Sequence, residues 1–306
     1  MSEHRILHVE SPASIGLDTG RLCIRAEGRP PWFGCVEDVA ALSLADPAIR
    51  VSSQALAALA ERGAVVLLAD GRHLPVALVQ PVRASSLVAG RIRLQAEWMA
   101  AHPAHADKLW AHIVSAKLAM QADALKRRGL NGHLRLSRLA GRVTPGDASN
   151  VEAQAARHYW KCLFPPGFRR AKRDAADHLN AKLNYGYAIL RALVARHLAL
   201  AGLEPSLGLH HRGTTNPFNL ADDLMEPLRP IVDGIVRDEL MEEGPLDREA
   251  KRALLGVMER SVRLDDGREY RLHAALESIV QSLVRAMERP GRARLVLPEA
   301  CGDAAE

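Results

Sequence analysis

Imidazole and carboxylate side chains stand close together in residues 208–233, which read GLHHRGTTNPFNLADDLMEPLRPIVD. Asp223 and Glu226 are three residues apart, so on a helix they share one face. His210 and His211 precede this face by a loop that can fold back on it. Neutral imidazole with carboxylates, and water completing the shell, is an ordinary binding site for a divalent metal ion. The segment is therefore a candidate metal centre.

A helix start explains the same acidic residues without any chemistry. Asn219 has the residue type of a helix N-cap, and acids in the first turn, such as Asp222 and Asp223, complement the helix dipole. Asp222 lies four residues before Glu226 and can share its face in place of Asp223. Both interpretations stay open on this segment alone.

A second candidate is Glu152, in TPGDASNVEAQAARHYW at residues 144–160. Ser149 followed by Glu152 matches the S-x-x-E capping box, in which the glutamate bonds a backbone N–H at the helix start. The local sequence by itself favours this structural role. Arg157 and the aromatic residues behind it suit contacts with phosphates and bases, and equally a helix that packs its aromatic face inward.

A third segment, residues 180–190, places Asn180, Asn184 and Tyr187 in an otherwise apolar helical pattern. Hydrogen bonding between helices is the favoured explanation for these polar groups.

The basic residues are concentrated in the middle of the chain. The formal net charge of +5 divides into −2 for residues 1–80, +13 for residues 81–200 and −6 for residues 201–306. Such segregation is typical of a surface that binds a polyanion, and it is also compatible with a solvated helical surface rich in arginine. The candidate DNA contacts are Arg157, Arg169, Arg170, Lys172 and Arg173.

Composition and periodicity predict an α+β protein. Residues 1–80 read as short strands and turns, including a hairpin turn at Asp18-Thr19-Gly20, whereas apolar residues recur at helical intervals from about residue 91. We therefore expect a small β-rich domain at 1–80, a linker at 81–92, an all-helical domain at 93–288 and a flexible tail at 289–306. The sequence has no apolar run long enough for a membrane span and no signal-peptide pattern at its start, and its four cysteines are scattered, so we expect a protein of the reducing cytoplasm.

Taken in order, these segments resemble one family, the metal-dependent integrase subunit of CRISPR spacer acquisition. The resemblance rests on ASIGLDTGRLCI and VVLLADGRHLPVALV in the β-rich region, then DASNVEAQAARHYW, LNAKLNYGYAIL and the segment at 208–233. It spans roughly residues 5–285 and is closest to the branch found beside single-protein RNA-guided effector nucleases.

The resemblance implies a metal site made of one glutamate, one histidine and a further acid. By motif position these are Glu152, His211 and Glu226, the last of which stands where many relatives carry aspartate. A supporting or alternative role for Asp223 stays open, as does one for His210. The resemblance reverses the local preference at Glu152, from cap to ligand.

The activity that the resemblance implies is integration of short DNA fragments into the CRISPR array. A 3′-hydroxyl of the fragment attacks a phosphodiester of the repeat in a direct transesterification, with Mg²⁺ or Mn²⁺ as the cofactor and no covalent enzyme intermediate. The basic middle of the chain would hold double-stranded DNA through its phosphates.

The resemblance also implies protein partners. Two chains pair through their N-terminal regions, and two such dimers flank a dimer of a small ferredoxin-like protein to give a heterohexamer. Contact with the effector nuclease stays open. Two alternatives remain: a metal-dependent endonuclease acting on branched DNA, and a non-catalytic DNA-binding module.

Overall fold

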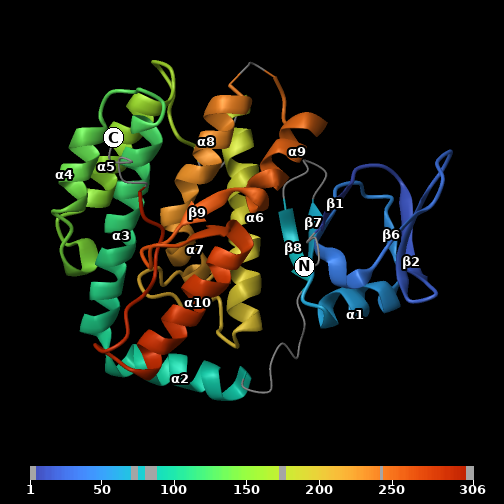
Figure 1. Cartoon of the computed structure of the whole chain (residues 1–306), viewed down its shortest axis with the longest axis horizontal. Helices are drawn as coiled ribbons and strands as arrows, with labels where there is room; N and C mark the ends of the chain where they lie inside the picture. The colour runs from blue at the N-terminus through green and yellow to red at the C-terminus, as the bar shows by residue number, and fades with distance from the viewer. Residues whose placement is uncertain (1–4, 70–74, 80–87, 172–176, 242–243, 301–306) are drawn as a thin grey trace. The chain divides into compact units, whose positions relative to one another are not determined.

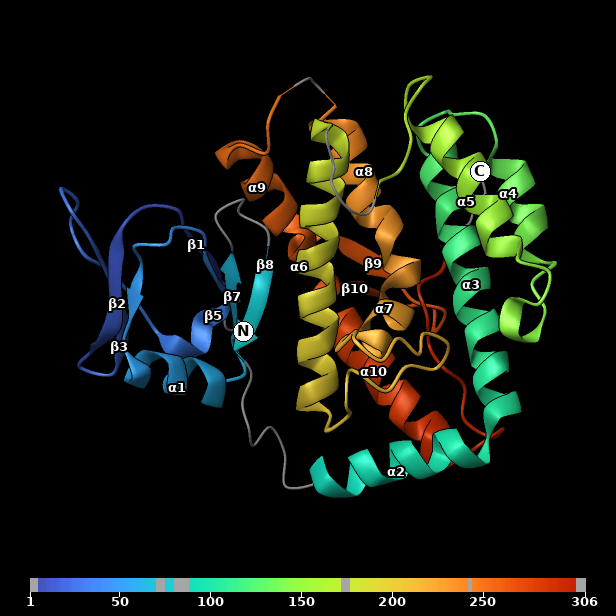
Figure 2. The same cartoon turned by 180° about the vertical axis from the view of Figure 1, so that it is seen from behind.

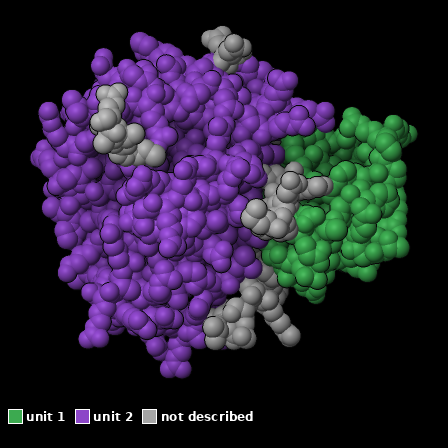
Figure 3. Space-filling view, in the orientation of Figure 1, with its two compact units in different colours: residues 1–88 green, residues 89–306 purple. Residues whose placement is uncertain are grey.

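The computed structural model describes residues 5–69, 75–79, 88–171, 177–241 and 244–300. The chain divides into two compact units, Met1–Val88 and Ala89–Glu306, which Figure 3 shows in green and purple. Strands dominate the first unit and helices the second, so the predicted α+β class is confirmed.

The first unit contains two four-stranded sheets. One has the order β1-β5-β7-β8, with β1 parallel to β5, β5 parallel to β7, and β8 antiparallel to β7. The other has the order β4-β3-β2-β6. The strands are β1 (Arg5–Val9), β2 (Ala13–Asp18), β3 (Arg21–Ala26), β4 (Trp32–Gly34), β5 (Val39–Leu44), β6 (Arg50–Val51), β7 (Val65–Ala69) and β8 (Pro75–Val79), with the short helices η1 (Val36–Asp38) and α1 (Ser53–Glu61).

Local sequence signals account for two turns of this unit. Thr19 and Gly20 both have positive φ and join β2 to its antiparallel neighbour β3, as a tight hairpin requires. Ser52 caps α1 by accepting a hydrogen bond from the Ala55 N–H at 3.2 Å. The hairpin turn was predicted from residue type.

The second unit is a helical assembly. Its helices are α2 (Val88–Ala101), α3 (Pro103–Lys126), α4 (His133–Ala140), η2 (Pro145–Asp147), α5 (Val151–Leu163), α6 (His178–Leu200), α7 (Asn219–Met225), η3 (Glu226–Leu228), α8 (Arg229–Glu239), α9 (Arg248–Leu255), η4 (Gly256–Glu259) and α10 (Leu272–Glu288). The long helices α3 and α6 stand on either side of α7 and α8 (Figures 1 and 2). Buried leucine and isoleucine side chains along α3, such as Leu109, Ile113 and Leu118, attach it to this core.

The structure corrects two expectations for this unit. It is not wholly helical, because β9 (Ser261–Arg263) and β10 (Glu269–Arg271) form an antiparallel pair. The described part of the tail expected to be flexible is packed, since Leu295 and Leu297 are buried and Val296 N–H donates to Ser282 Oγ at 2.9 Å. Apolar residues at alternate positions pack this segment against the unit.

Two further points concern the chain as a whole. Of the predicted linker, residues 81–87 lie outside the described residues, and residues 88–92 belong to α2. No helix in the described part of the chain is both long and apolar enough to span a membrane.

Candidate metal centre

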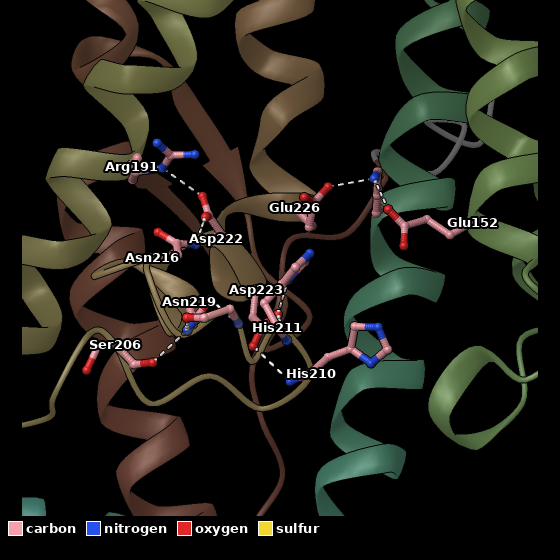
Figure 4. A network of polar contacts seen from close by, with 12 residues as sticks. Glu152, Arg191, Ser206, His210, His211, Asn216, Asn219, Asp222, Asp223 and Glu226 are labelled. Carbon is pink, nitrogen blue, oxygen red and sulfur yellow. Dashed lines mark hydrogen bonds and ion pairs between the residues drawn. The ribbon is translucent and has the colours of Figure 1, made fainter. Parts of the chain in front are cut away.

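The carboxylate of Asp223 organises the loop that carries the two histidines. It is fully buried on α7 and accepts three hydrogen bonds (Figure 4). Oδ1 accepts from His211 Nδ1 at 2.6 Å and from the His211 backbone N–H at 3.2 Å, while Oδ2 accepts from the His210 N–H at 3.0 Å. Asp223 therefore positions the histidine loop.

The hydrogen bond also sets which nitrogen of His211 is available. Because Nδ1 faces Asp223, Nε2 is the atom left to bind a metal ion. The bond to Asp223 raises the pKa of His211 above its ordinary value, against the effect of burial, and the charge of Glu226 adds to this shift. The side chain is 44% exposed, so a ligand can reach it.

The side chain of Asn219 also stabilises this loop by hydrogen bonds to its backbone. The sequence predicted an N-cap here, but Asn219 is the first residue of α7 and its side chain bonds the loop instead. Its amide accepts from the Gly213 N–H at 3.2 Å and donates to the carbonyls of Ser206 and Gly213 at 3.0 and 2.9 Å. Gly208 lies so close to the His211 carbonyl that an added Cβ would overlap it, so this position excludes larger residues.

Trp110, on α3, supports the loop from the other side. Its buried ring stacks on His210, with ring centroids 4.2 Å apart and planes inclined by 3°, and meets the edge of His211 at 5.6 Å. His210 is thus held by Trp110 and by its backbone bond to Asp223. A tryptophan on an apolar helix face is normally interpreted as a core residue, so no feature of the sequence predicted the stacking of Trp110 on His210.

Glu226 is the buried acid of the site. It begins η3, directly after α7, and its Oε1 accepts from Arg229 Nε at 2.9 Å. Its Oε2 lies 2.5 Å from Lys117 Nζ, although no hydrogen bond of normal geometry reaches this oxygen. Burial alone would raise the pKa of Glu226, but the charges of Arg229 and Lys117 lower it to about 2. Glu226 is therefore ionised and able to bind a cation.

Glu152 faces the same lysine from α5. Lys117 Nζ donates to Glu152 Oε1 at 2.6 Å, and Glu152 and Glu226 point toward one another in Figure 4. The predicted capping box is wrong, because Asp147 caps α5: its two oxygens accept from the N–H groups of Val151 and Glu152 at 2.9 and 3.0 Å. The Glu152 side chain is thereby released from the helix start.

Lys117 links the two acids and was missed by sequence reasoning. It projects from α3 and is 7% exposed. Burial disfavours its ammonium form, yet the charges of Glu226 and Glu152 raise the pKa of Lys117 above its ordinary value. The ammonium is therefore a fixed positive charge between two carboxylates that are far apart in the sequence.

Within the described ranges, no three His, Cys, Asp or Glu side chains are close enough to hold a metal ion as they stand. Two observations nevertheless fit a divalent cation. Glu152 and Glu226 already surround a positive charge, and the buried Oε2 of Glu226 lacks a hydrogen bond of normal geometry. Two carboxylates and an imidazole form a donor set that suits Mg²⁺ or Mn²⁺.

Asp222 does not join this group. Its oxygens accept from Arg191 Nε at 2.7 Å and from Asn216 Nδ2 at 2.8 Å, so it ties the loop to α6. Asp223 and Asp222 therefore both accept hydrogen bonds from the histidine loop. Of the three acids, Glu226 alone contacts Lys117.

The candidate DNA contacts divide into three groups. Arg157 and Arg169 are exposed. Arg170 is turned inward, where it donates to Asn180 Oδ1 at 2.9 Å and to Asn184 Oδ1 at 2.6 Å, and burial lowers its pKa. Lys172 and Arg173 lie outside the described residues.

The polar residues of α6 bond within the protein, as predicted. Asn180 also accepts from the Ala171 N–H at 2.8 Å, and the Tyr187 hydroxyl donates to the buried Asp233. The guanidinium of Arg229 lies over the ring of Tyr187, 4.6 Å from its centroid. This network therefore supports Arg229, which donates to Glu226.

Known proteins share both the sequence pattern and the fold. A family model described as CRISPR associated protein Cas1 matches residues 7–250. A CRISPR-associated endonuclease Cas1 from Neisseria meningitidis serogroup C is 35% identical over 300 residues, which cover 96% of each chain. Among solved structures, a casposase bound to its integration product has a TM-score of 0.74 at 17% identity, covering 92% of this chain and 90% of its own. A Cas6-RT-Cas1–Cas2 complex has a TM-score of 0.71 at 20% identity, covering 94% of this chain and 35% of its own. The chain belongs to the CRISPR-associated protein Cas1 family.

Proposed function

We propose that this protein is the integrase of CRISPR adaptation, which joins the 3′-hydroxyl of a short DNA fragment to a phosphodiester of the CRISPR repeat. Membership of the Cas1 family supports the reaction class. One observation carries the assignment of the site: Glu152 and Glu226, from separate helices, face the same buried ammonium at 2.6 and 2.5 Å. His211 is held on a loop that Asp223 fixes to α7, the helix directly before Glu226.

Glu152, His211 and Glu226 would hold a divalent cation, Mg²⁺ or Mn²⁺. When bound, the cation supplies positive charge for the phosphate oxygens and orients the attacking hydroxyl or the leaving group. Glu152 and Glu226 offer anionic oxygens, and His211 offers Nε2, which favours Mn²⁺. Asp223 keeps that nitrogen directed away from the loop by holding Nδ1.

Double-stranded DNA is the proposed substrate and ligand. The 20 basic and 7 acidic residues of positions 81–200 supply the charge for phosphate contacts. Exposed Arg157 and Arg169 are the described candidates for such contacts, with Lys172 and Arg173 beside them in the sequence. Contacts of this kind position DNA without reading its sequence.

The proposed assembly is a heterohexamer, in which two dimers of this chain flank a dimer of a small ferredoxin-like partner. A solved structure of similar fold is a Cas6-RT-Cas1–Cas2 complex, which supports a partner of that kind. The N-terminal unit, with a balance of −2 over residues 1–80, suits contact with protein better than contact with DNA.

A metal-dependent endonuclease acting on branched DNA is the second candidate, because the curated relative is named an endonuclease. Hydrolysis and transesterification differ only in the nucleophile, so one product assay separates them. A labelled fragment is incubated with a supercoiled repeat plasmid, the partner protein and Mn²⁺. We expect label covalently joined to the plasmid, and no joining when the fragment ends in a 2′,3′-dideoxynucleotide. Cleaved ends without joints would favour the endonuclease.

A further inference from the structure

Lys117 lies between the two carboxylates that the proposed function assigns as metal ligands. Its Nζ lies 2.6 Å from Glu152 Oε1 and 2.5 Å from Glu226 Oε2, and the three side chains come from α3, α5 and η3. The lysine is therefore the only described group that joins both acids directly.

Electrostatics explains why a positive charge is needed there without a metal. Two carboxylates brought together at low exposure repel one another, and burying an uncompensated charge is strongly unfavourable. Glu226 and Lys117 are 6% and 7% exposed and the Glu152 side chain is 29% exposed, so solvent screens the contact between Lys117 and Glu226 little. The ammonium on its four-carbon stem compensates both acids at once.

The same geometry makes the ammonium and a metal ion mutually exclusive. A carboxylate oxygen bound to Mg²⁺ sits about 2.0–2.1 Å from the ion, and one bound to Ca²⁺ sits about 2.3–2.6 Å away. An ammonium within 2.6 Å of the same two oxygens fills that volume and repels a second cation.

We propose that Lys117 is an internal counter-cation, which holds Glu152 and Glu226 together in the metal-free protein and is displaced when a divalent cation binds. This inference rests on the proposed function, which assigns these two carboxylates as metal ligands. Lys117 is thus a positioning residue that also weakens metal binding, because the ion must compete with it.

Calorimetry of MnCl₂ binding to chelator-stripped protein tests the competition. Lys117→Met keeps the stem and removes the charge, so the metal-free variant melts several degrees lower while its Kd for Mn²⁺ tightens about tenfold, a change of 1.4 kcal/mol. An unaltered or weaker Kd would overturn the proposal. A lysine with a purely structural role would not give tighter binding when it is removed.

Two controls separate this inference from the proposed function. Lys182→Met removes another buried ammonium of the same unit, which donates to the Leu240 carbonyl at 3.0 Å, and should leave the Kd for Mn²⁺ unchanged. Glu226→Ala should abolish Mn²⁺ binding. If Glu226→Ala still binds Mn²⁺ like the wild type, the ligand assignment fails. If Glu226→Ala abolishes Mn²⁺ binding but Lys117→Met does not tighten the Kd for Mn²⁺, the counter-cation role of Lys117 fails and the ligand assignment stands.

A crystal structure of the wild-type protein with Mn²⁺, located by its anomalous signal, decides the matter even where Lys117→Met does not fold. We expect Mn²⁺ bound by Glu152 and Glu226, with Nζ no longer in contact with both. Mn²⁺ on these carboxylates with both lysine contacts intact would overturn the proposal.

Discussion

The buried carboxylate of Asp223 holds the ring of His211 by a hydrogen bond of 2.6 Å to Nδ1. The backbone N–H of His211 donates to the same oxygen at 3.2 Å, so ring and main chain are fixed at one point. A ring held in this way presents Nε2 with little freedom to rotate. Carboxylates that hold a metal-binding histidine are important for affinity, and their loss typically lowers it about 10–100-fold.

Asp223→Asn should therefore weaken Mn²⁺ binding by about 10–100-fold, measured by calorimetry. The matched control is Asp222→Asn, one position earlier on α7, because Asp222 contacts Arg191 and Asn216 and neither of the two histidines. We expect a much smaller change there. Equal losses in the two variants would show that local charge, and not the grip on His211, determines the affinity.

The cap of α5 is Asp147, so Asp147→Ala should lower the free energy of unfolding by about 1–2 kcal/mol. Ser149→Ala should change it by no more than about 0.5 kcal/mol, because Ser149 makes no cap in the structure. Urea unfolding of the two variants measures this. The reverse order of effects would restore the capping box that the sequence indicated.

Asp233 should make the stability of the protein depend on pH, with a sign that follows from its raised pKa. Burial raises its pKa to about 6, against the opposing hydrogen bonds from Tyr187 and Tyr159. The folded protein therefore holds this proton more tightly than the unfolded chain, whose aspartate pKa is about 3.9. Between about pH 4 and pH 6 this group makes the free energy of unfolding fall as pH rises, by about 3 kcal/mol in total.

The measurement is urea unfolding of the wild type and Asp233→Asn across that pH range. Taking the difference between the two proteins cancels the other carboxyl groups. We expect the variant to gain stability relative to the wild type as pH rises through this window. A flat difference, or one of opposite sign, would contradict the raised pKa.

Exposed arginines should determine how DNA binding depends on salt. Each phosphate contact contributes about 0.9 to the slope of log K against log salt, so Arg157→Ala with Arg169→Ala should reduce the slope by about 2. Arg170→Ala is the contrast, because Arg170 bonds Asn180 and Asn184 inside the protein. It should lower the melting temperature and leave the slope almost unchanged. A full slope in the double variant would remove both arginines from the interface.

Much of the fold could be predicted because its signals are local. The hairpin at Thr19-Gly20 and the cap at Ser52 depend on residue type at a single turn, and helical periodicity distinguished the second unit from the first. Residues 289–300 show the limit of such signals. Their packing depends on Ser282 and on core positions distant in sequence, which no local pattern reveals.

The candidate ligands could be named from motif order, but the groups that hold them could not. Lys117 stands four residues after buried Ile113 and three after buried Val114, so a charged residue interrupting an apolar helix face was the available signal. Asp147 was hidden by a better-known pattern at Ser149 and Glu152. At Lys117 the decisive contacts join separate helices, whereas at Asp147 a different local cap replaced the expected one.

Strand transfer by ligand variants tests the central claim most directly. A labelled fragment with a free 3′-hydroxyl, a supercoiled repeat plasmid, the partner protein and Mn²⁺ are combined with wild type, His211→Ala or Glu226→Ala, and covalent joints are counted alongside DNA affinity. We predict joints with the wild type, none with either variant, and DNA affinity near that of the wild type throughout. Joints formed at the wild-type rate by either variant would contradict the assignment of Glu152, His211 and Glu226 as the catalytic metal centre.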